Sequence, residues 1–380
     1  MRADVDVKDD NVSLERFLSF LRTGISDIEE LDYENFFRQE KVQRMLKVGC
    51  QNEADMQSTL LSISENLAEM DVFKACMAGY IVGLYGERGV ANCGCDDVLI
   101  DFFTEMIARC IDLVENTSLC SSTDDQDGGE NGQVDVDELF RLYPDDVKAY
   151  FGTPMLAAGV ISRIVRCGRL RDRLRCVEEL FCSCEVLSEC MANVGAIPYI
   201  LRTVEYELVV VISPVHATAI EVEVRQVDNN FMFFTLLQLE MYHRGILEQF
   251  GAFNFEYNES VEDLTKSGQM KCEGCVDGIY DTACFGYYNY LSMGRDCFQN
   301  VGDPKACIVG TDTLYDIPRV DGRLIVLTDK PEFTMSWGKS FIRPIHPAMS
   351  PSVRVSRIMD YSEFCSWMDK VSRAAICDER

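Results

Sequence analysis

The chain has 380 residues, 47% hydrophobic and 26% charged, which are ordinary globular values and exclude wholesale disorder. Its formal net charge is −27, and residues 1–150 hold 32 acidic but only 13 basic side chains. Such a surface repels phosphate backbones and anionic lipids, so we expect no nucleic-acid and no membrane partner. A protein partner with a basic surface or a metal cation fits this charge, and simple solubility is the alternative.

The sequence predicts neither export nor membrane insertion. The first ten residues, MRADVDVKDD, carry charges where a signal peptide needs an apolar run. The most apolar stretch, residues 208–220, contains Pro214 and His216 and is shorter than the roughly 18–20 residues that span a bilayer. We therefore expect a soluble cytoplasmic protein in which most of the 18 cysteines are reduced thiols.

Helical periodicity dominates the chain from Ser13 to about Val194, because apolar residues recur at spacings of three and four. Pro144 is expected to break or kink one of these helices. We predict an acidic α-helical domain over residues 1–195, a bundle or paired-helix array with an acidic connector at 120–136. The predicted helices cover residues 14–21, 28–48, 56–70, 72–85, 98–114, 137–150, 154–167 and 171–191.

Near Gly195 the period changes to that of β-structure. Residues 206–213 and 217–225 flank a proline and predict a β-hairpin, and the second arm alternates apolar with charged residues, as a sheet with one wet face requires. Because the connections read as short, we predict an antiparallel sheet. The fold class is then α+β, with a smaller α+β domain at 196–380 after the helical one. Further strands are expected at 323–328 and 352–359, and helices at 231–242 and 362–374.

The sharpest motif is DGGENGQVDVDE at residues 127–138. With Asp127 at position 1, Asn131, Asp135 and Glu138 take positions 5, 9 and 12, and a glycine takes position 6. The stretch resembles the calcium loop of the EF-hand family. The resemblance implies a calcium ion held by these four side chains, with Glu138 in the first turn of a following helix.

The same stretch departs from the EF-hand pattern in three ways. Gly129 at position 3 removes one side-chain oxygen, the entering segment lacks apolar residues, and no second loop accompanies it. A calcium site with these departures is expected to be weak. The alternative is an acidic, glycine-rich connector that starts a helix at its exit.

Cysteine chemistry is the other candidate. Cys272 and Cys275 form a C-x-x-C pair, which can supply two zinc ligands from one turn, although a second pair at the usual spacing is absent. Zinc, a redox-active dithiol and plain thiols all stay open. An enzyme with a cysteine-based site in residues 270–310 is a further alternative, for example with Cys284 and His346 as a nucleophile–base pair.

The segment from Asp316 onwards has a recognisable order of D-I-P, Gly322-Arg323, an apolar strand and then Ser336-Trp337. In this respect it resembles the C-terminal part of uncharacterised bacterial proteins with a D-I-P…G-x-R…S-W order. That resemblance implies a module of hairpin, strand and helix, and it brings no activity.

Motifs of established enzyme classes do not occur in the sequence. It contains no G-x-S-x-G, no phosphate-binding glycine loop and no H-E-x-x-H. The sequence therefore favours an intracellular protein-binding or regulatory protein over an enzyme. Calcium and zinc are the only cofactors that its motifs suggest.

Overall fold

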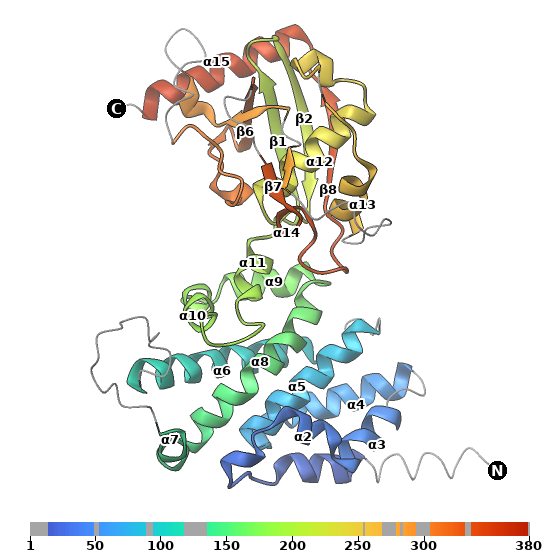
Figure 1. The fold of residues 1–380 in the computed structure, drawn as a ribbon, viewed down its shortest axis with the longest axis vertical. Coiled ribbons are helices and arrows are strands. Elements are labelled where there is room, and N and C mark those ends of the chain that lie inside the picture. The colour runs from blue at the N-terminus through green and yellow to red at the C-terminus, as the bar shows by residue number, and fades with distance from the viewer. Residues whose placement is uncertain are drawn as a thin grey trace, which may run out of the picture. The chain divides into compact units, whose positions relative to one another are not determined.

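The computed structural model describes residues 14–48, 53–88, 94–117, 135–253, 255–267, 279–281, 284–293, 305–330 and 336–378. The chain forms two compact units, Met1–Leu201 and Arg202–Arg380. The first is built from helices and the second from a mixed sheet with helices (Figure 1), which confirms the predicted α+β class.

In the first unit, aspartates begin several helices. Asp27, Asp32 and Asp71 each accept backbone N–H groups of the turn that follows them. The prediction of one helix over 28–48 is wrong, because the cap at Asp32 and the extended backbone of Gln39 divide this stretch. Residues 14–22 are helical. The other elements are η1 (Ile28–Glu30), α2 (Tyr33–Arg38), α3 (Glu40–Val48), α4 (Glu53–Glu65), η2 (Leu67–Glu69), α5 (Val72–Glu87), α6 (Asp96–Thr117), α7 (Val136–Leu142), α8 (Pro144–Ile164), α9 (Gly168–Arg175), α10 (Leu180–Leu187) and α11 (Ala196–Arg202).

Prolines and one unusual backbone angle set the helix boundaries from α7 to α10. Pro144 ends α7 and opens α8 at its first position, where a missing N–H costs nothing. The helix predicted to start at Pro154 is instead the second half of α8, which continues through that proline. The helix predicted over 171–191 is two helices, because Glu179 between α9 and α10 has a left-handed φ of 68°.

Helices α5 and α8 lie side by side in backbone contact (Figure 1). A Cβ added at Gly83 of α5 would lie 2.3 Å from the Cα of Gly159 on α8. A Cβ at Gly159 would lie 2.7 Å from the carbonyl oxygen of Gly79. Small residues are therefore required on both helices at this crossing, around which the core of the first unit is packed.

Two ion pairs are buried within the first unit. Lys148 Nζ lies 2.9 Å from Asp71, and Arg163 Nη2 lies 2.7 Å from Asp96. Asp71 also accepts the backbone N–H of Ile25 at 3.0 Å. Buried charges of this kind are tolerated only when they are paired and hydrogen-bonded, so each pair ties together segments far apart in the sequence.

The second unit is built on a sheet with strand order β4-β6-β1-β2-β8, with β5 beside β6, and β3 pairs separately with β7. Its strands are β1 (Glu207–Ser213), β2 (Thr218–Arg225), β3 (Ile279–Asp281), β4 (Gly286–Tyr288), β5 (Arg319–Val320), β6 (Arg323–Asp329), β7 (Ser336–Gly338) and β8 (Ser352–Ile358). Its helices are α12 (Asn230–His243), η3 (Leu247–Phe250), α13 (Glu259–Ser267), η4 (Tyr290–Ser292), η5 (Leu314–Asp316), α14 (Lys339–Ile342) and α15 (Tyr361–Asp378).

The predicted hairpin is confirmed, since β1 and β2 pair antiparallel. The prediction of an antiparallel sheet is wrong at β6, which pairs in parallel with β1 from Val209 opposite Leu324 to Ile212 opposite Leu327. A parallel partner needs a long crossover, and β2, α12 and the segments that follow provide it. The short connections that motivated the prediction join β1 to β2 and β5 to β6, and both of these pairs are antiparallel.

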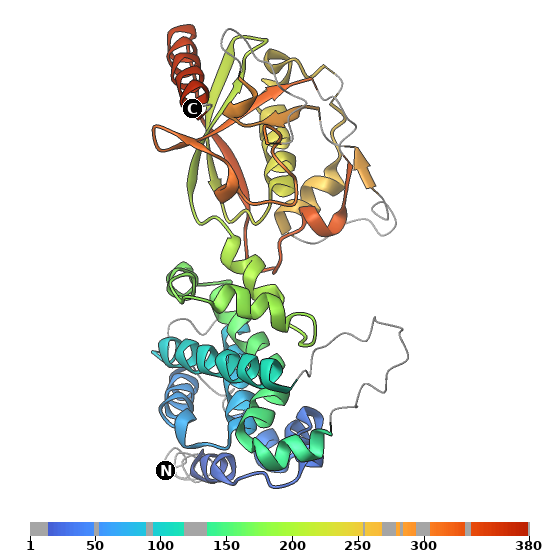
Figure 2. The ribbon, with the colours of Figure 1, turned by 90° about the vertical axis from the view of Figure 1, so that its left-hand side faces the viewer.

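Alternate residues of the strands serve two cores on opposite faces of the sheet. Val209 and Val211 pack in the cluster that includes α12, whereas Val210 and Ile212 pack in the cluster that includes α15. Figure 2 shows the two helices on opposite sides of the strands. Alternation with period two is what a sheet covered on both faces requires.

Strand β8 lies at the edge of this sheet, and side chains of α12 occupy its outer backbone groups. Glu240 Oε1 accepts the N–H of Val355 at 3.0 Å, and Arg244 Nη2 lies 3.5 Å from the carbonyl oxygen of the same residue. The pairing with β2 also shifts register next to Glu221, where Ser356 donates to the Glu221 carbonyl. Both features are typical of protected edge strands.

Cysteines are mostly thiols, as expected from the sequence. Cys190 is disulfide-bonded, whereas the other cysteines whose side chains are described are thiols. None of the described helices is both long and apolar enough to cross a bilayer.

Candidate functional site

The motifs that the sequence singles out fall largely outside the described residues. Asp127, Asn131, Cys272 and Cys275 all lie there, so calcium and zinc binding stay predictions. Among the residues that are described, no group of three or more His, Cys, Asp or Glu side chains could hold a metal.

The exit of the EF-hand-like stretch is described. Asp135 caps α7, and one of its carboxylate oxygens accepts the backbone N–H groups of Asp137 and Glu138 at 3.1 Å. Glu138 is exposed in the first turn of this helix, as the sequence predicts. Asp135 therefore already has a structural role as a helix cap.

Cys284, the proposed nucleophile, is held as a neutral thiol. Its Sγ lies 2.8 Å and its backbone N–H 2.7 Å from the amide oxygen of Gln238, a buried residue of α12. Burial raises the pKa of Cys284 to about 12, whereas a nucleophilic thiolate needs a lowered pKa. His346, its suggested base, accepts the N–H of Ala348 through Nδ1.

The best-formed candidate site is a pocket of about 640 Å³ at one edge of the sheet of the second unit. β1 and β6 are adjacent and parallel, so their carboxyl ends meet at this edge. The turn after β1 supplies Val215 and His216, and the end of β6 supplies Asp329 and Lys330. The carboxyl ends of parallel strands are where ligands bind in open α/β sheets.

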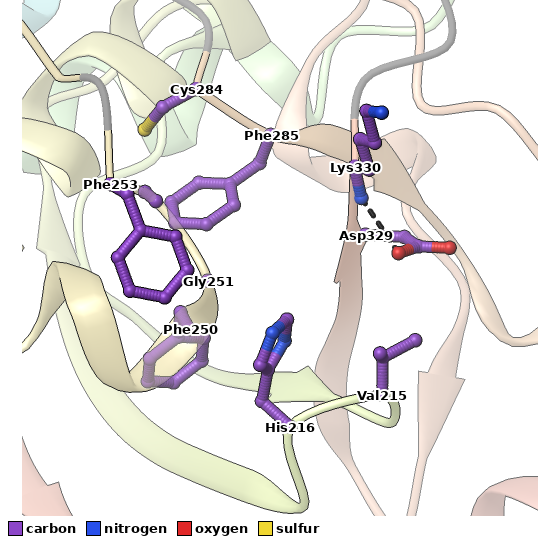
Figure 3. A pocket seen from close by; sticks show the side chains of 10 residues that line it. Val215, His216, Phe250, Gly251, Phe253, Cys284, Phe285, Asp329 and Lys330 are labelled. Carbon is purple, nitrogen blue, oxygen red and sulfur yellow. Dashed lines mark hydrogen bonds between the residues drawn. The ribbon is translucent and has the colours of Figure 1, made fainter.

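Aromatic rings form the opposite wall of the pocket. Phe250 ends η3, Phe253 lies in the loop that follows, and Phe285 lies directly before β4, with Cys284 beside it. Figure 3 shows these rings on one side, Asp329 and Lys330 on the other, and His216 between them. Apolar walls with a few polar groups are typical of small-molecule sites of this size.

His216 is positioned by two contacts. Its Nδ1 lies 3.1 Å from the hydroxyl oxygen of Ser213, which is fully buried. A Cβ at Gly251 would lie 2.2 Å from Cε1 and 2.6 Å from Nε2 of the ring, so the imidazole rests against glycine backbone. Gly251 also has a φ of 86°, which side chains disfavour. The site therefore requires glycine at this position both for space and for conformation.

The two charged side chains of the pocket, Asp329 and Lys330, differ in whether they already have a hydrogen-bond partner. Asp329 accepts the backbone N–H of Lys330 at 2.7 Å (Figure 3). The ammonium of Lys330 is exposed and forms no ion pair with the described residues. The pocket thus offers one available cation and an imidazole to a ligand, next to an apolar wall.

A second pocket, of about 790 Å³, lies in the first unit between the helix at 14–22, η1, α2 and α5. Two of its cationic groups are already used within the fold. Arg38 pairs with Glu34 at 2.5 Å, and Lys74 Nζ donates to the carbonyl oxygens of Phe20 and Thr23, which end the first helix. We therefore take the pocket of the second unit as the candidate site.

Sequence reasoning missed this site because its residues come from four separate segments. The available signal was weak: polar residues follow two apolar strands, as Ser213–His216 and as Asp329–Lys330. This signal indicates a common site only when β1 and β6 are known to be parallel neighbours. No protein-family model, curated protein or solved structure matches this chain.

Proposed function

We propose that the second unit binds a small organic anion with an aromatic or branched apolar body in the pocket at the ends of β1 and β6. The observation that carries this proposal is that Lys330, whose ammonium forms no ion pair with the described residues, lines the pocket on the side opposite the rings of Phe250 and Phe285. The rings would cover the apolar body, and Lys330 and His216 would receive the anionic group.

Binding of benzoate and indole-3-acetate, followed by ligand-detected NMR on the full chain, tests this proposal. Benzamide and indole-3-acetamide are the neutral controls. Lys330→Met should weaken binding of the acids several-fold and leave the amides unchanged, since only the acids carry a charge. Asp329→Asn should strengthen binding of the acids, because it removes a like charge from the pocket.

Lys370→Met is the matched control, because Lys370 lies on α15, pairs with Asp321 and does not line the pocket. Equal affinity of the wild type and Lys330→Met for both acids would refute the proposed role of the ammonium. Tighter binding of the amides than of the acids would refute the anion preference itself.

A second candidate function is the binding of a cytoplasmic protein partner with a basic surface by the first unit. The charge of residues 1–150 favours it, as does the surface around α7. There, Leu142 and Tyr143 are 62% and 46% exposed close to Asp137 and Glu138. Acidic and apolar groups side by side are complementary to a basic amphipathic segment.

An amphipathic peptide of leucine and lysine is a suitable probe for this second function. We expect it to bind the full chain with an affinity that falls as salt rises from 50 to 300 mM. A salt-independent affinity would contradict the electrostatic argument.

A further inference from the structure

An aromatic cluster lies at the surface of the second unit, formed by residues that do not line the pocket. Tyr242 ends α12, and Phe255 and Tyr257 precede α13. The rings of Tyr242 and Tyr257 are stacked with centroids 5.0 Å apart and an angle of 8°, and Phe255 lies 5.4 Å from Tyr242. Tyr242 is 42% and Tyr257 39% exposed, so part of this stack faces solvent. We call these three residues the tyrosine platform.

Glu262 holds the platform in place. Its carboxylate accepts the hydroxyl of Tyr257 at 2.8 Å and lies 3.0 Å from Nε2 of His243 and 2.5 Å from Nζ of Lys266. Burial opposes ionisation of Glu262, but hydrogen bonds from Lys266, Tyr257 and His243 outweigh it and lower the pKa to about 2. A phenol that donates to a fixed carboxylate has a more electron-rich ring, which strengthens its attraction for cations.

The surroundings of the platform are negative. Residues 240–266 contain six carboxylates and only two basic side chains. Both basic groups are engaged, since Lys266 pairs with Glu262 and Arg244 lies 3.0 Å from Glu240. Glu256, between the two aromatic residues of the loop, is exposed and forms no ion pair with the described residues. A cation arriving here therefore meets partly exposed aromatic rings in acidic surroundings.

We infer that the tyrosine platform binds an arginine side chain in a basic segment of a protein partner, with the guanidinium stacked on an exposed ring face and close to Glu256. A planar guanidinium fits a ring face and sheds water more readily than an ammonium does. The charge complementarity between the guanidinium and the acidic surroundings favours this occupant over an apolar segment. The surface is separate from the ligand pocket, so either proposal can fail alone.

The test is calorimetric titration of the full chain with a blocked hexapeptide of alternating arginine and glycine, and with the same peptide carrying citrulline in place of arginine. We expect the arginine peptide to bind and the citrulline peptide to bind much more weakly. Tyr257→Leu should weaken binding about two- to five-fold, as the loss of one exposed cation–π contact implies. Tyr257→Phe, which keeps the ring, should have less than half of that effect.

Tyr361→Leu is the matched control, since Tyr361 is 71% exposed on α15 and is not part of the platform. It also separates the platform from unspecific attraction by the acidic first unit, which every variant retains. Equal affinity of Tyr257→Leu and Tyr361→Leu, or of the two peptides, would overturn the inference, as would no binding of either peptide. If circular dichroism shows that Tyr257→Leu is unfolded, the exposed Glu256→Gln decides: weaker binding supports the platform, and unchanged binding overturns it.

Discussion

Replacing Gly83 by alanine probes the contact on which the helical unit is built. The added Cβ would lie 2.3 Å from the Cα and 2.4 Å from the carbonyl oxygen of Gly159. Carbon atoms prefer separations of roughly 3.5–4.0 Å, so α5 and α8 must move apart by about 1 Å. The obstacle is backbone, which cannot rotate away as the end of a side chain can.

Two opposing terms set the size of the effect. Overpacking a well-filled core costs about 1–3 kcal/mol, and a fixed obstacle places Gly83→Ala at the upper end of that range. Alanine is more favourable than glycine inside a helix by about 1 kcal/mol, which offsets part of this cost. We therefore expect the free energy of unfolding to fall by about 2 kcal/mol. Without the contact, the substitution would instead raise it.

Urea denaturation of the full chain, followed by circular dichroism at 222 nm, measures this change as a shift of the transition of the helical unit. Gly79→Ala is a graded comparison, because its Cβ would meet a terminal methyl group of Leu156, at 2.4 Å, which can rotate. Gly24→Ala is the control, because nothing lies within 4 Å of the added atom. The loss in the free energy of unfolding should be largest for Gly83→Ala, smaller for Gly79→Ala and smallest for Gly24→Ala. A midpoint for Gly83→Ala at or above that of the wild type would refute the close crossing.

Three further outcomes follow from buried groups. Asp71→Asn, which removes the nearer and buried carboxylate of Lys148 and leaves only the exposed Asp145 at 3.6 Å, should lower the free energy of unfolding by about 3 kcal/mol in the same urea assay. Burial raises the pKa of Asp228 to about 6, so the stability that its protonated form contributes is full below about pH 4 and is lost as the pH rises through 6. Asp228→Asn should therefore stabilise the chain by roughly 3 kcal/mol at pH 8 and have little effect at pH 4, and equal effects at both pH values would contradict this pH dependence. Cys284, with its pKa raised to about 12, should react with N-ethylmaleimide at pH 7.5 at least about ten-fold more slowly than the exposed Cys176, as mass spectrometry of peptides can measure.

Local patterns in the sequence were enough to predict much of the second unit. The alternation in 217–225 predicted β2, and the apolar runs predicted β6 and α12, because each of these elements is specified by its own residues. Helix boundaries in the first unit were less accessible. Nothing local indicates that α8 continues through Pro154, which packing on both sides of the helix stabilises.

The candidate site could not be predicted, and the reason is the parallel pairing of β1 with β6. Strand pairing across more than a hundred residues depends on the packing of everything between them, which no spacing in the sequence reports. His216 and Lys330 line one pocket because this pairing brings them to the same edge of the sheet. The sequence suggested Cys284 as a nucleophile because it is a cysteine. Its burial raises the pKa of the thiol, which makes it a poor nucleophile.

The occupied edge of β8 has a consequence for how this chain behaves at high concentration. A bare edge strand is a template on which a second molecule can add its own strand, the first step of domain swapping and fibril growth. Here an incoming strand would have to displace both Glu240 and Arg244 from Val355 before it could form a hydrogen bond at that residue. Glu240 and Arg244, which pair with each other at 3.0 Å, would lose these contacts with the backbone. Side chains at the end of the helix that covers one face of the sheet thus also hinder the addition of a second molecule at its edge strand.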